Sequence, residues 1–376
     1  MKPTYDAIVI GLGAMGSAAA HQLSRRGLRV LAIEQFDVGN AMGSSHGRSR
    51  VIRKAYFEDP RYVPLLHTAY DLWREMESQT GGSLLHLVGC MNIGPREHEC
   101  IRGVLESVRE HGLAHEILTA TEISARWPAF RPADGDVGVF EADGGYVVPE
   151  QCVRLQIDEA KRHGAVIQCR ERVIGWTSSS SGVEVETTAG RYAAAKLIVT
   201  AGPWLPELMA SLGLPLRVER QVQLWFRPID ATGLPEARLP SFIHFVGERA
   251  YYGIPMRDEH GMKVARHHDG DITTPDSVNR EMTAADESDA RDYMKEHLPA
   301  INGPLLDARV CLYTNTPDDH FIIDRDPRDE RVVIAGGFSG HGFKFAPVVG
   351  SILADLAMDG RTSHPVDLFR IARFGA

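Results

Sequence analysis

The start of the chain alternates short apolar runs with glycine-rich and polar stretches. Residues 6–10 form a β-branched run, and residues 11–16 then read GLGAMG. A helix-prone segment follows at residues 17–26, and Gly27 after it is a typical helix stop. Residues 29–34 form a second apolar run. This order of strand, glycine-rich turn, helix and strand predicts a βαβ unit.

Strand and turn signals recur in the middle and near the end of the chain. Four short runs after Lys161 favour strands, and the serine-rich residues 178–182 favour a hairpin turn. These runs lie at residues 166–170, 172–176, 183–187 and 197–200. We expect them to form a small meander that returns to the main sheet. A further strand is predicted at residues 332–335, before the glycine-rich residues 336–342 and a final helix at about 346–358.

The two regions between these signals have a different composition. They are richer in Trp, Tyr, Pro and alternating polar and apolar positions, which favours an antiparallel sheet. The predicted fold class is therefore α/β (α+β overall). A Rossmann-like nucleotide-binding domain is expected at residues 1–82, 148–218 and 320–376, and a discontinuous substrate domain at residues 83–147 and 219–319.

Composition narrows the class of protein. A chain of 376 residues with 43% hydrophobic positions is long enough for two domains, and no run approaches the ~20 apolar residues of a membrane helix. The net charge of −9 argues against a nucleic-acid partner. The polar first residues lack the pattern of a secretory signal, so we expect a cytoplasmic protein without membrane or nucleic-acid partners.

Neither a disulfide framework nor a metal site is expected. The five cysteines are widely spread and form no CxxC pair. His267 and His268 are adjacent, and neighbours on a strand face opposite sides, so we do not expect this pair to bind a metal.

The first glycine-rich turn predicts a dinucleotide site. Gly11, Gly13 and Gly16 lack a Cβ, which lets backbone N–H groups and a helix N-terminus approach a pyrophosphate. Glu34 ends the second strand at a spacing close to the ~20 residues typical of a ribose-binding acid. A turn of this kind without a ligand is the alternative, but the complete set of signals favours binding. The motif does not separate FAD from NAD.

Six longer motifs resemble a known family. They are GSSHGRSRVIRKAY at 43–56, YVPL at 62–65, YYGIP at 251–255, GMK at 261–263, CLYTNTPDDHFIID at 311–324 and GHGFKF at 340–345. Together they resemble the monomeric sarcosine oxidase and N-methyltryptophan oxidase family over essentially the whole chain. The resemblance implies FAD, a two-domain glutathione-reductase-type fold, and oxidation of secondary amino acids by O2 to an imine and hydrogen peroxide.

The resemblance also implies roles for cationic residues. Arg53 and Lys344 are expected to hold the substrate carboxylate, which a guanidinium fork binds bidentately. Arg50 is expected over the flavin. Lys263 is expected where O2 reacts, because a buried cation stabilises superoxide. The alternative for Lys263 is a strand-edge lysine, and the basic stretch 48–54 is by default a solvated loop.

Other expected roles concern the amine and the flavin. His267 is expected near the substrate amine, and Tyr252 in the pocket or in the core. Cys311 is expected to carry the flavin as a thioether, although a lone cysteine is more often an ordinary core residue. The other cofactor contacts implied by the resemblance are at Ser44, His46, Val173, Gly202, Gly340 and Gly342. The helix after residue 342 is expected to point its N-terminus at the flavin pyrimidine ring.

The sequence departs from the family motif at two positions. Ser45 replaces the first family histidine, and Arg48 stands where relatives commonly have an acid. Residues 43–47 also fit the GxSxG pattern of hydrolases, but that motif requires a strand before it and a helix after it, which this stretch does not suggest.

Two alternatives to an oxidase remain open. One is a dehydrogenase that passes electrons to a carrier, and the other is a flavin-binding subunit of a larger complex. The expected oxidase acts as a monomer on a small amino acid and O2. Sarcosine, N-methyltryptophan, pipecolate and other N-alkyl amino acids are all candidate substrates, because residues 243–245 match no obvious side-chain preference.

Overall fold

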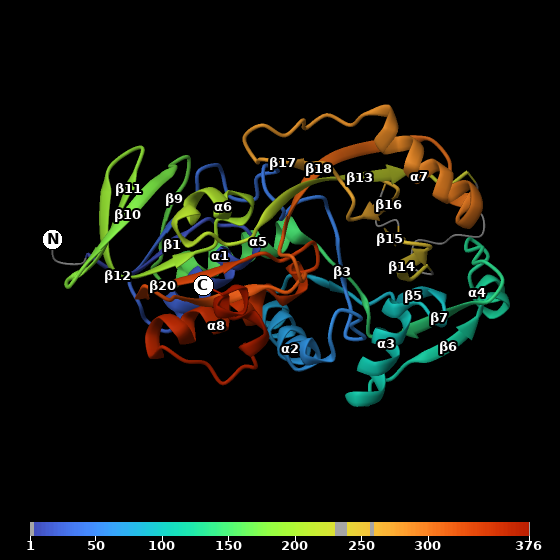
Figure 1. Ribbon diagram of the computed structural model, residues 1–376, viewed down its shortest axis with the longest axis horizontal. Coiled ribbons are helices and arrows are strands. Elements are labelled where there is room, and N and C mark those ends of the chain that lie inside the picture. The colour runs from blue at the N-terminus through green and yellow to red at the C-terminus, as the bar shows by residue number, and fades with distance from the viewer. Residues whose placement is uncertain (1–3, 230–238, 256–258, 376) are drawn as a thin grey trace.

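The protein contains two large sheets, as the computed structural model of residues 4–229, 239–255 and 259–375 shows (Figure 1). One sheet has eight strands and the other nine, and a small three-stranded sheet is also present among the described residues. The prediction that the chain has no secretory signal used the first residues of the sequence. Of these, residues 1–3 lie outside the described residues. No helix in the described ranges is long and apolar enough to cross a membrane.

The eight-stranded sheet has a parallel core. Strand β1 (Tyr5–Ile10) lies between β2 (Val30–Ile33) and β12 (Arg191–Val199), and Ile8 pairs with Leu31 on one side and Leu197 on the other. β9 (Val166–Gln168) continues the sheet beyond β2, and β20 (Asp329–Gly336) pairs with the end of β12. The antiparallel strands β10 (Val173–Ser179), β11 (Gly182–Thr187) and β19 (Ile322–Asp326) complete it.

Both faces of this sheet are covered, which explains the uninterrupted apolar run of β1. Ala7 and Val9 pack into one core cluster, whereas Ile8 and Ile10 belong to another. The first cluster includes residues of the helices α1 (Ala14–Arg25), α2 (Val63–Thr80), α5 (Pro149–Arg162) and α8 (Ala346–Asp359), and also residues of a further helix at Glu99–Glu110. The short α6 (Leu205–Leu208) contributes to the second cluster.

The nine-stranded sheet is built around two long antiparallel strands, β13 (Arg217–Phe226) and β18 (Leu305–Asn315). Its other strands are β5 (Cys90–Pro95), β6 (Glu116–Thr119), β7 (Asp136–Glu141), β14 (Ser241–Val246), β15 (Arg249–Ile254), β16 (Met262–His267) and β17 (Ile272–Thr273). Helices α3 (Glu99–Glu110), α4 (Ala120–Arg126) and α7 (Ala284–His297) belong to the same part of the chain. The sheet is antiparallel as expected, except that β14 and β5 pair in parallel.

The third sheet is small. It consists of β3 (Arg50–Ile52), β8 (Gly145–Val147) and β4 (Leu85–His86), in that order. The predicted α/β fold class is confirmed. The strands of the two large sheets divide between the two predicted sets of segments, apart from the first residues of β13. We therefore keep the predicted domain boundaries as a proposal.

Several elements differ from their predicted form. The helix after the first glycine turn begins at Ala14 rather than Ser17, and the strand predicted at residues 197–200 begins at Arg191. The strand expected at residues 166–170 is not part of the meander, because β9 pairs with β2 at the opposite edge of the sheet. A 3-10 turn, Phe343–Phe345, separates the last glycine-rich loop from α8.

Candidate active site

A cavity of about 380 Å³ lies at the carboxyl-terminal ends of β1, β2 and β12. In parallel sheets, this end is where ligands bind. Residues of the first glycine-rich turn (11–16), of the glycine-rich loop at 336–342 and of the end of β18 line the cavity. The predicted cofactor residues that line it are Gly11, Gly13, Glu34, Ser44, Arg50, Val173, Gly202, Gly340 and Gly342.

The first glycine turn is shaped for a close ligand. Gly11 has φ +84°, and a Cβ there would lie 2.6 Å from the Thr200 carbonyl oxygen. Gly13 is the N-cap of helix α1 and supplies no side-chain cap, and the first turn of the helix has no acidic residue. The Ala14 N–H donates to Ser45 Oγ at 3.0 Å, and this positive end of the helix lies at the cavity, where it favours an anion. These features fit the pyrophosphate of a dinucleotide.

Glu34 is held against this turn. It is buried, and its two carboxylate oxygens accept hydrogen bonds from the Leu12 N–H at 2.8 Å and the Phe36 N–H at 3.0 Å. Burial raises the pKa of Glu34 above its usual value. Each oxygen keeps acceptor capacity for a ribose hydroxyl.

Gly16 contributes through packing rather than as a lining residue. A Cβ at Gly16 would lie 1.7 Å from the Gly11 carbonyl oxygen and 2.5 Å from Thr200 Oγ1. Only glycine lets α1 approach the end of β1 this closely. His46, Cys311 and Lys344 also lie outside the cavity lining, and each is buried beside it.

Cys311 lies on β18 directly before Leu312 and Tyr313, which line the cavity. Its Sγ is 3.5 Å from Arg50 Nη2 and 3.8 Å from the Ser44 carbonyl oxygen. These contacts place the thiol beside residues 43–50, the stretch that the resemblance assigns to the flavin.

Lys263 and Arg50 share one acceptor. Lys263 Nζ donates to the carbonyl oxygens of Gly47 (2.5 Å) and Ser49 (2.8 Å) and to Gln223 Oε1 (2.8 Å). Arg50 Nη1 donates to the same Gln223 oxygen at 3.1 Å. Burial, and then the charge of Arg50, lower the pKa of Lys263 well below its usual value. The expected strand-edge alternative does not apply, because Lys263 is 1% exposed.

Arg53 and Lys344 each lie over the ring of Tyr56. The Arg53 guanidinium carbon is 4.3 Å from the ring centroid, and Lys344 Nζ is 5.0 Å from it. Arg53 Nη2 donates to both oxygens of Glu58 at 3.0 Å, whereas its Nε and Nη1 are buried and have no partner among the described residues. Lys344 Nζ donates to the His341 carbonyl oxygen at 2.6 Å. Burial, and then Arg53, lower the pKa of Lys344 to about 7.

We expected His267 and His268 to face opposite sides of a strand, but the structure places their rings side by side. β16 ends at His267, and His268 adopts a left-handed φ of +65°, so the two ring centroids lie 4.1 Å apart. Burial, and then His268, lower the pKa of His267 well below its usual value. Burial opposes the charge of His268, but the Glu219 carboxylate outweighs this and raises its pKa. His267 Nδ1 lies 3.1 Å from the Tyr313 hydroxyl.

Two further predicted residues, Tyr252 and His46, are also largely enclosed by the protein. The ring of Tyr252 is 6.3 Å from that of His267, and burial raises the pKa of Tyr252 to about 12. His46 is buried, and neither of its ring nitrogens has a hydrogen-bond partner within the described ranges. Burial, and then Arg50, lower the pKa of His46 to about 3. Ser45 Oγ accepts a hydrogen bond from the Ala14 N–H, and no helix follows it, so the GxSxG pattern does not form a nucleophile elbow.

Sequence reasoning missed four residues of this site: Tyr56, Glu58, Gln223 and Tyr313. Three were within reach, since Tyr56 and Tyr313 belong to motifs singled out above and Glu58 follows one of them. Gln223 gave no signal, because its position in the site depends on the pairing of β13 with β16.

The fold and the cavity define a dinucleotide-binding oxidoreductase. The sequence model of the FAD dependent oxidoreductase family matches residues 6–356, and the chain belongs to this family. Among its relatives, the monomeric sarcosine oxidase of Streptomyces avermitilis is 43% identical, over 100% of this chain and 99% of the relative. The N-methyl-L-tryptophan oxidase of Yersinia pestis is 35% identical, over 98% of this chain and 99% of the relative. The resemblance drawn from the motifs is thereby confirmed.

Solved structures give the same fold. NikD, described as an unusual amino acid oxidase essential for nikkomycin biosynthesis, matches with a TM-score of 0.86 and 25% identity over 98% of both chains. L-proline dehydrogenase from P. horikoshii matches with a TM-score of 0.85 and 23% identity, over 100% of this chain and 99% of that chain. The second likeness concerns the fold alone.

Proposed function

We propose that the protein uses FAD to oxidise a secondary amino acid, N-methylated or N-alkylated, to an imine, and that O2 is reduced to hydrogen peroxide. The names of the relatives support this class of substrate. The observation that carries the proposal is the arrangement of Arg53 and Lys344 around Tyr56. Two buried cations, one of which has guanidinium nitrogens without a partner in the part of the chain that the structure describes, form a place for the carboxylate of an amino acid.

Glu58 gives Arg53 a definite orientation. Both Glu58 oxygens accept from Nη2 alone, and an incoming carboxylate can accept from Nε and Nη1, which have no partner among the residues described. Lys344 then supplies the second positive charge. A pKa of about 7 means that part of the Lys344 population is neutral in the free protein, and a bound carboxylate favours the charged form.

FAD, when bound, accepts the electrons of the substrate C–H bond and passes them to O2. The residues that would hold it are the glycine turn, Glu34, Arg50 and the loop at residues 336–342. His267 is neutral because its pKa is lowered, so its ring can accept a hydrogen bond from the substrate amine. Lys263 supplies a buried positive charge on the oxygen-reacting side.

We further propose that the flavin is bound covalently through Cys311. The position of the thiol beside Arg50, Ser44 and the cavity supports this. Acid denaturation of the yellow protein tests it. Colour is expected to stay with the polypeptide, to be released from Cys311→Ser, and to stay in the control Cys169→Ser, which changes an exposed cysteine. Colour released from the unaltered protein contradicts the covalent bond.

Turnover experiments test the main proposal. The protein is titrated without oxygen with sarcosine, N-methyl-L-tryptophan, L-pipecolate and glycine, and flavin reduction is followed by absorbance. Oxygen is then admitted and peroxide is measured. One equivalent of peroxide for each secondary amino acid consumed is expected. If the flavin stays oxidised with every amino acid, the proposal is wrong. If the flavin is reduced but stays reduced in air, the alternatives are favoured: a dehydrogenase, or a flavin-binding subunit of a larger complex.

The relatives named monomeric are matched over nearly their whole length. On this basis we propose that the chain also acts as a monomer, which gel filtration of the active protein tests. Its cytoplasmic location stays a prediction.

A further inference from the structure

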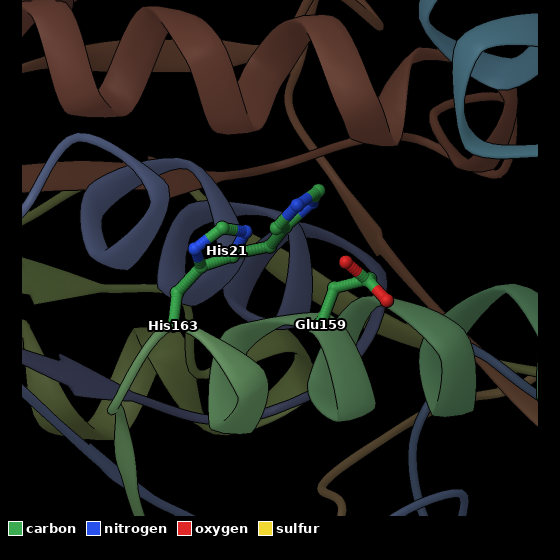
Figure 2. A group of neighbouring side chains, drawn as sticks. All are labelled: His21, Glu159 and His163. Atoms are coloured by element: carbon green, nitrogen blue, oxygen red, sulfur yellow. The ribbon is translucent and has the colours of Figure 1, made fainter. Parts of the chain in front are cut away.

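A group of two histidines and a glutamate lies outside the cavity, between two helices (Figure 2). His21 belongs to α1, Glu159 to α5, and His163 follows the last residue of α5. One ligand atom from each residue lies within 4.8 Å of the other two. Small rotations of these side chains would bring all three atoms into contact with a single cation.

The two helices fix these positions. Glu159 and His163 are four residues apart, so they lie on the same helix face one turn apart. On α1, Ser17 lies one turn before His21, and its Oγ donates to Gln156 Oε1 at 2.6 Å. This buried hydrogen bond sets the register of α1 against α5 and keeps His21 opposite Glu159.

His21 supplies a second, independent observation. Its side chain is 4% exposed, and its Nε2 is buried without a hydrogen-bond partner among the described residues. A buried polar atom without a partner is costly, so its presence calls for an explanation. A metal ion would satisfy it, since neutral imidazole nitrogen is a common metal ligand.

We propose that His21, Glu159 and His163 bind a divalent transition-metal ion of the zinc class. Two imidazoles and one carboxylate suit this class, and His163, the exposed member of the group, leaves room for water in a fourth position. The carboxyl-terminal ends of α1 and α5 carry partial negative charge near the site, which also favours a cation. The ion joins the helix that carries the first glycine turn to its neighbour α5.

Neighbouring cations oppose this binding and provide a sharp test. Arg162 Nε and Nη2 donate to Glu159 Oε2, and the Arg162 side chain is 62% exposed, so it can turn into solvent. Arg25 lies nearby on α1 but is paired with Glu75 at 2.7 Å. The metal and Arg162 therefore compete for one carboxylate.

The test uses the untagged, chelator-treated flavoprotein titrated with ZnCl2 by calorimetry. One equivalent is expected to bind, and His163→Ala and Glu159→Gln are each expected to weaken binding by at least about tenfold. His67→Ala, which removes another exposed helical histidine, is the matched control. Arg162→Ala is expected to tighten binding, a result that a purely structural role of these residues does not give.

Thermal unfolding gives a readout that does not depend on turnover. Zinc is expected to raise the unfolding midpoint of the unaltered protein and of His67→Ala, but not that of His163→Ala. The proposal is overturned if the unaltered protein binds no equivalent of zinc. It is also overturned if binding persists unchanged in both ligand variants. Flavin content and peroxide production are independent of either result, since none of the three residues lines the cavity.

Discussion

At the scale of single residues, the site is a group of buried charges with few counterions. Within the described ranges, the acceptors of Lys263 are all neutral oxygens, and one of them, Gln223 Oε1, is shared with Arg50. An amide oxygen stabilises both cations without neutralising either. When Lys263 is protonated, its charge is therefore available to an anion formed nearby, whereas a carboxylate in place of Gln223 would cancel it.

Replacing Lys263 by Met is expected to separate the two halves of the reaction. The side chain keeps its length but loses the charge, so the step with O2 is expected to slow by about 10²-fold or more. Reduction by substrate is expected to change far less, because Arg53 and Lys344 are intact. Stopped-flow absorbance measures both rates. Lys295→Met, at an exposed position on α7, serves as control, and equal losses in both steps would contradict the assigned role.

We expect anion binding to depend on pH, because the pKa of Lys344 is lowered to about 7. Its pKa of about 7 lies below the usual value, so its charge is present below this pH and is lost as pH rises through it. Affinity for a carboxylate is therefore expected to fall between pH 6 and pH 9, by about tenfold for one charge-assisted hydrogen bond. Propionate, which has no amine to titrate, is the suitable ligand, and the flavin spectrum reports its binding.

The control for this experiment is Lys344→Met, which is expected to bind propionate more weakly and with little dependence on pH, since Arg53 stays charged throughout. Lys161→Met, at an exposed position on α5, is expected to behave as the unaltered protein. A pH profile that is identical in the protein and in Lys344→Met would show that another group titrates.

The motifs predicted the members of this site but not their surroundings. Arg53 and Lys344 lie 291 positions apart in the sequence numbering, and only the resemblance joined them before the structure placed both against Tyr56. The predicted orientation of His268 was wrong. It required a strand that continues past His267, whereas β16 ends there and His268 has a left-handed φ. Backbone conformation at a strand end depends on tertiary contacts, here Glu219 and Tyr313, which a local pattern does not contain.

At the scale of elements, the contact of α1 with α8 shows why the terminal helix is apolar and carries a glycine. A Cβ at Gly350 would lie 2.6 Å from the backbone carbon and the Cβ of Ala18. The two helices therefore approach closely behind the glycine turn. Local patterns predicted both helices, since each has a long periodic run, but could not predict this crossing.

Gly350→Val is expected to force α8 away from α1. Inserting a branched side chain into a packed contact costs about 1–3 kcal/mol, which lowers the unfolding midpoint of a chain of this length by about 1–4 °C. Thermal unfolding followed by circular dichroism measures the change. Gly175→Ala is the matched control, because a Cβ there meets no atom within 4 Å. An unchanged midpoint for Gly350→Val would mean that the helices can separate without cost.

The same scale explains which strand predictions failed. The apolar run at residues 166–170 has the signal of a strand but no signal of its partner, and it pairs with β2 rather than with the meander. β12 was predicted from its buried end only, since its first residues, such as Arg191 and Tyr192, are more exposed where they pair with β11. Patterns therefore identify buried segments better than they identify neighbours.

At the scale of the whole molecule, the cavity joins distant parts of the chain. Its lining comes from the glycine turn, from residues 43–50, from β18 and from the loop at residues 336–342. β18 belongs to the nine-stranded sheet, whereas the glycine turn follows a strand of the other one. A ligand that fills this cavity contacts both sheets and is expected to stabilise them together.

Flavin binding is therefore expected to raise the stability of the entire chain in one cooperative transition. Cys311→Ser allows the comparison, because its flavin is expected to be removable and to be replaced in measured amounts. At a free FAD concentration one hundred times the dissociation constant, linkage adds about 2.7 kcal/mol to the free energy of unfolding. Thermal midpoints recorded at increasing FAD concentration, by circular dichroism and by tryptophan fluorescence, are expected to rise together. Midpoints that rise for one probe and stay fixed for the other would show that the two sheets unfold independently and that the cavity does not couple them.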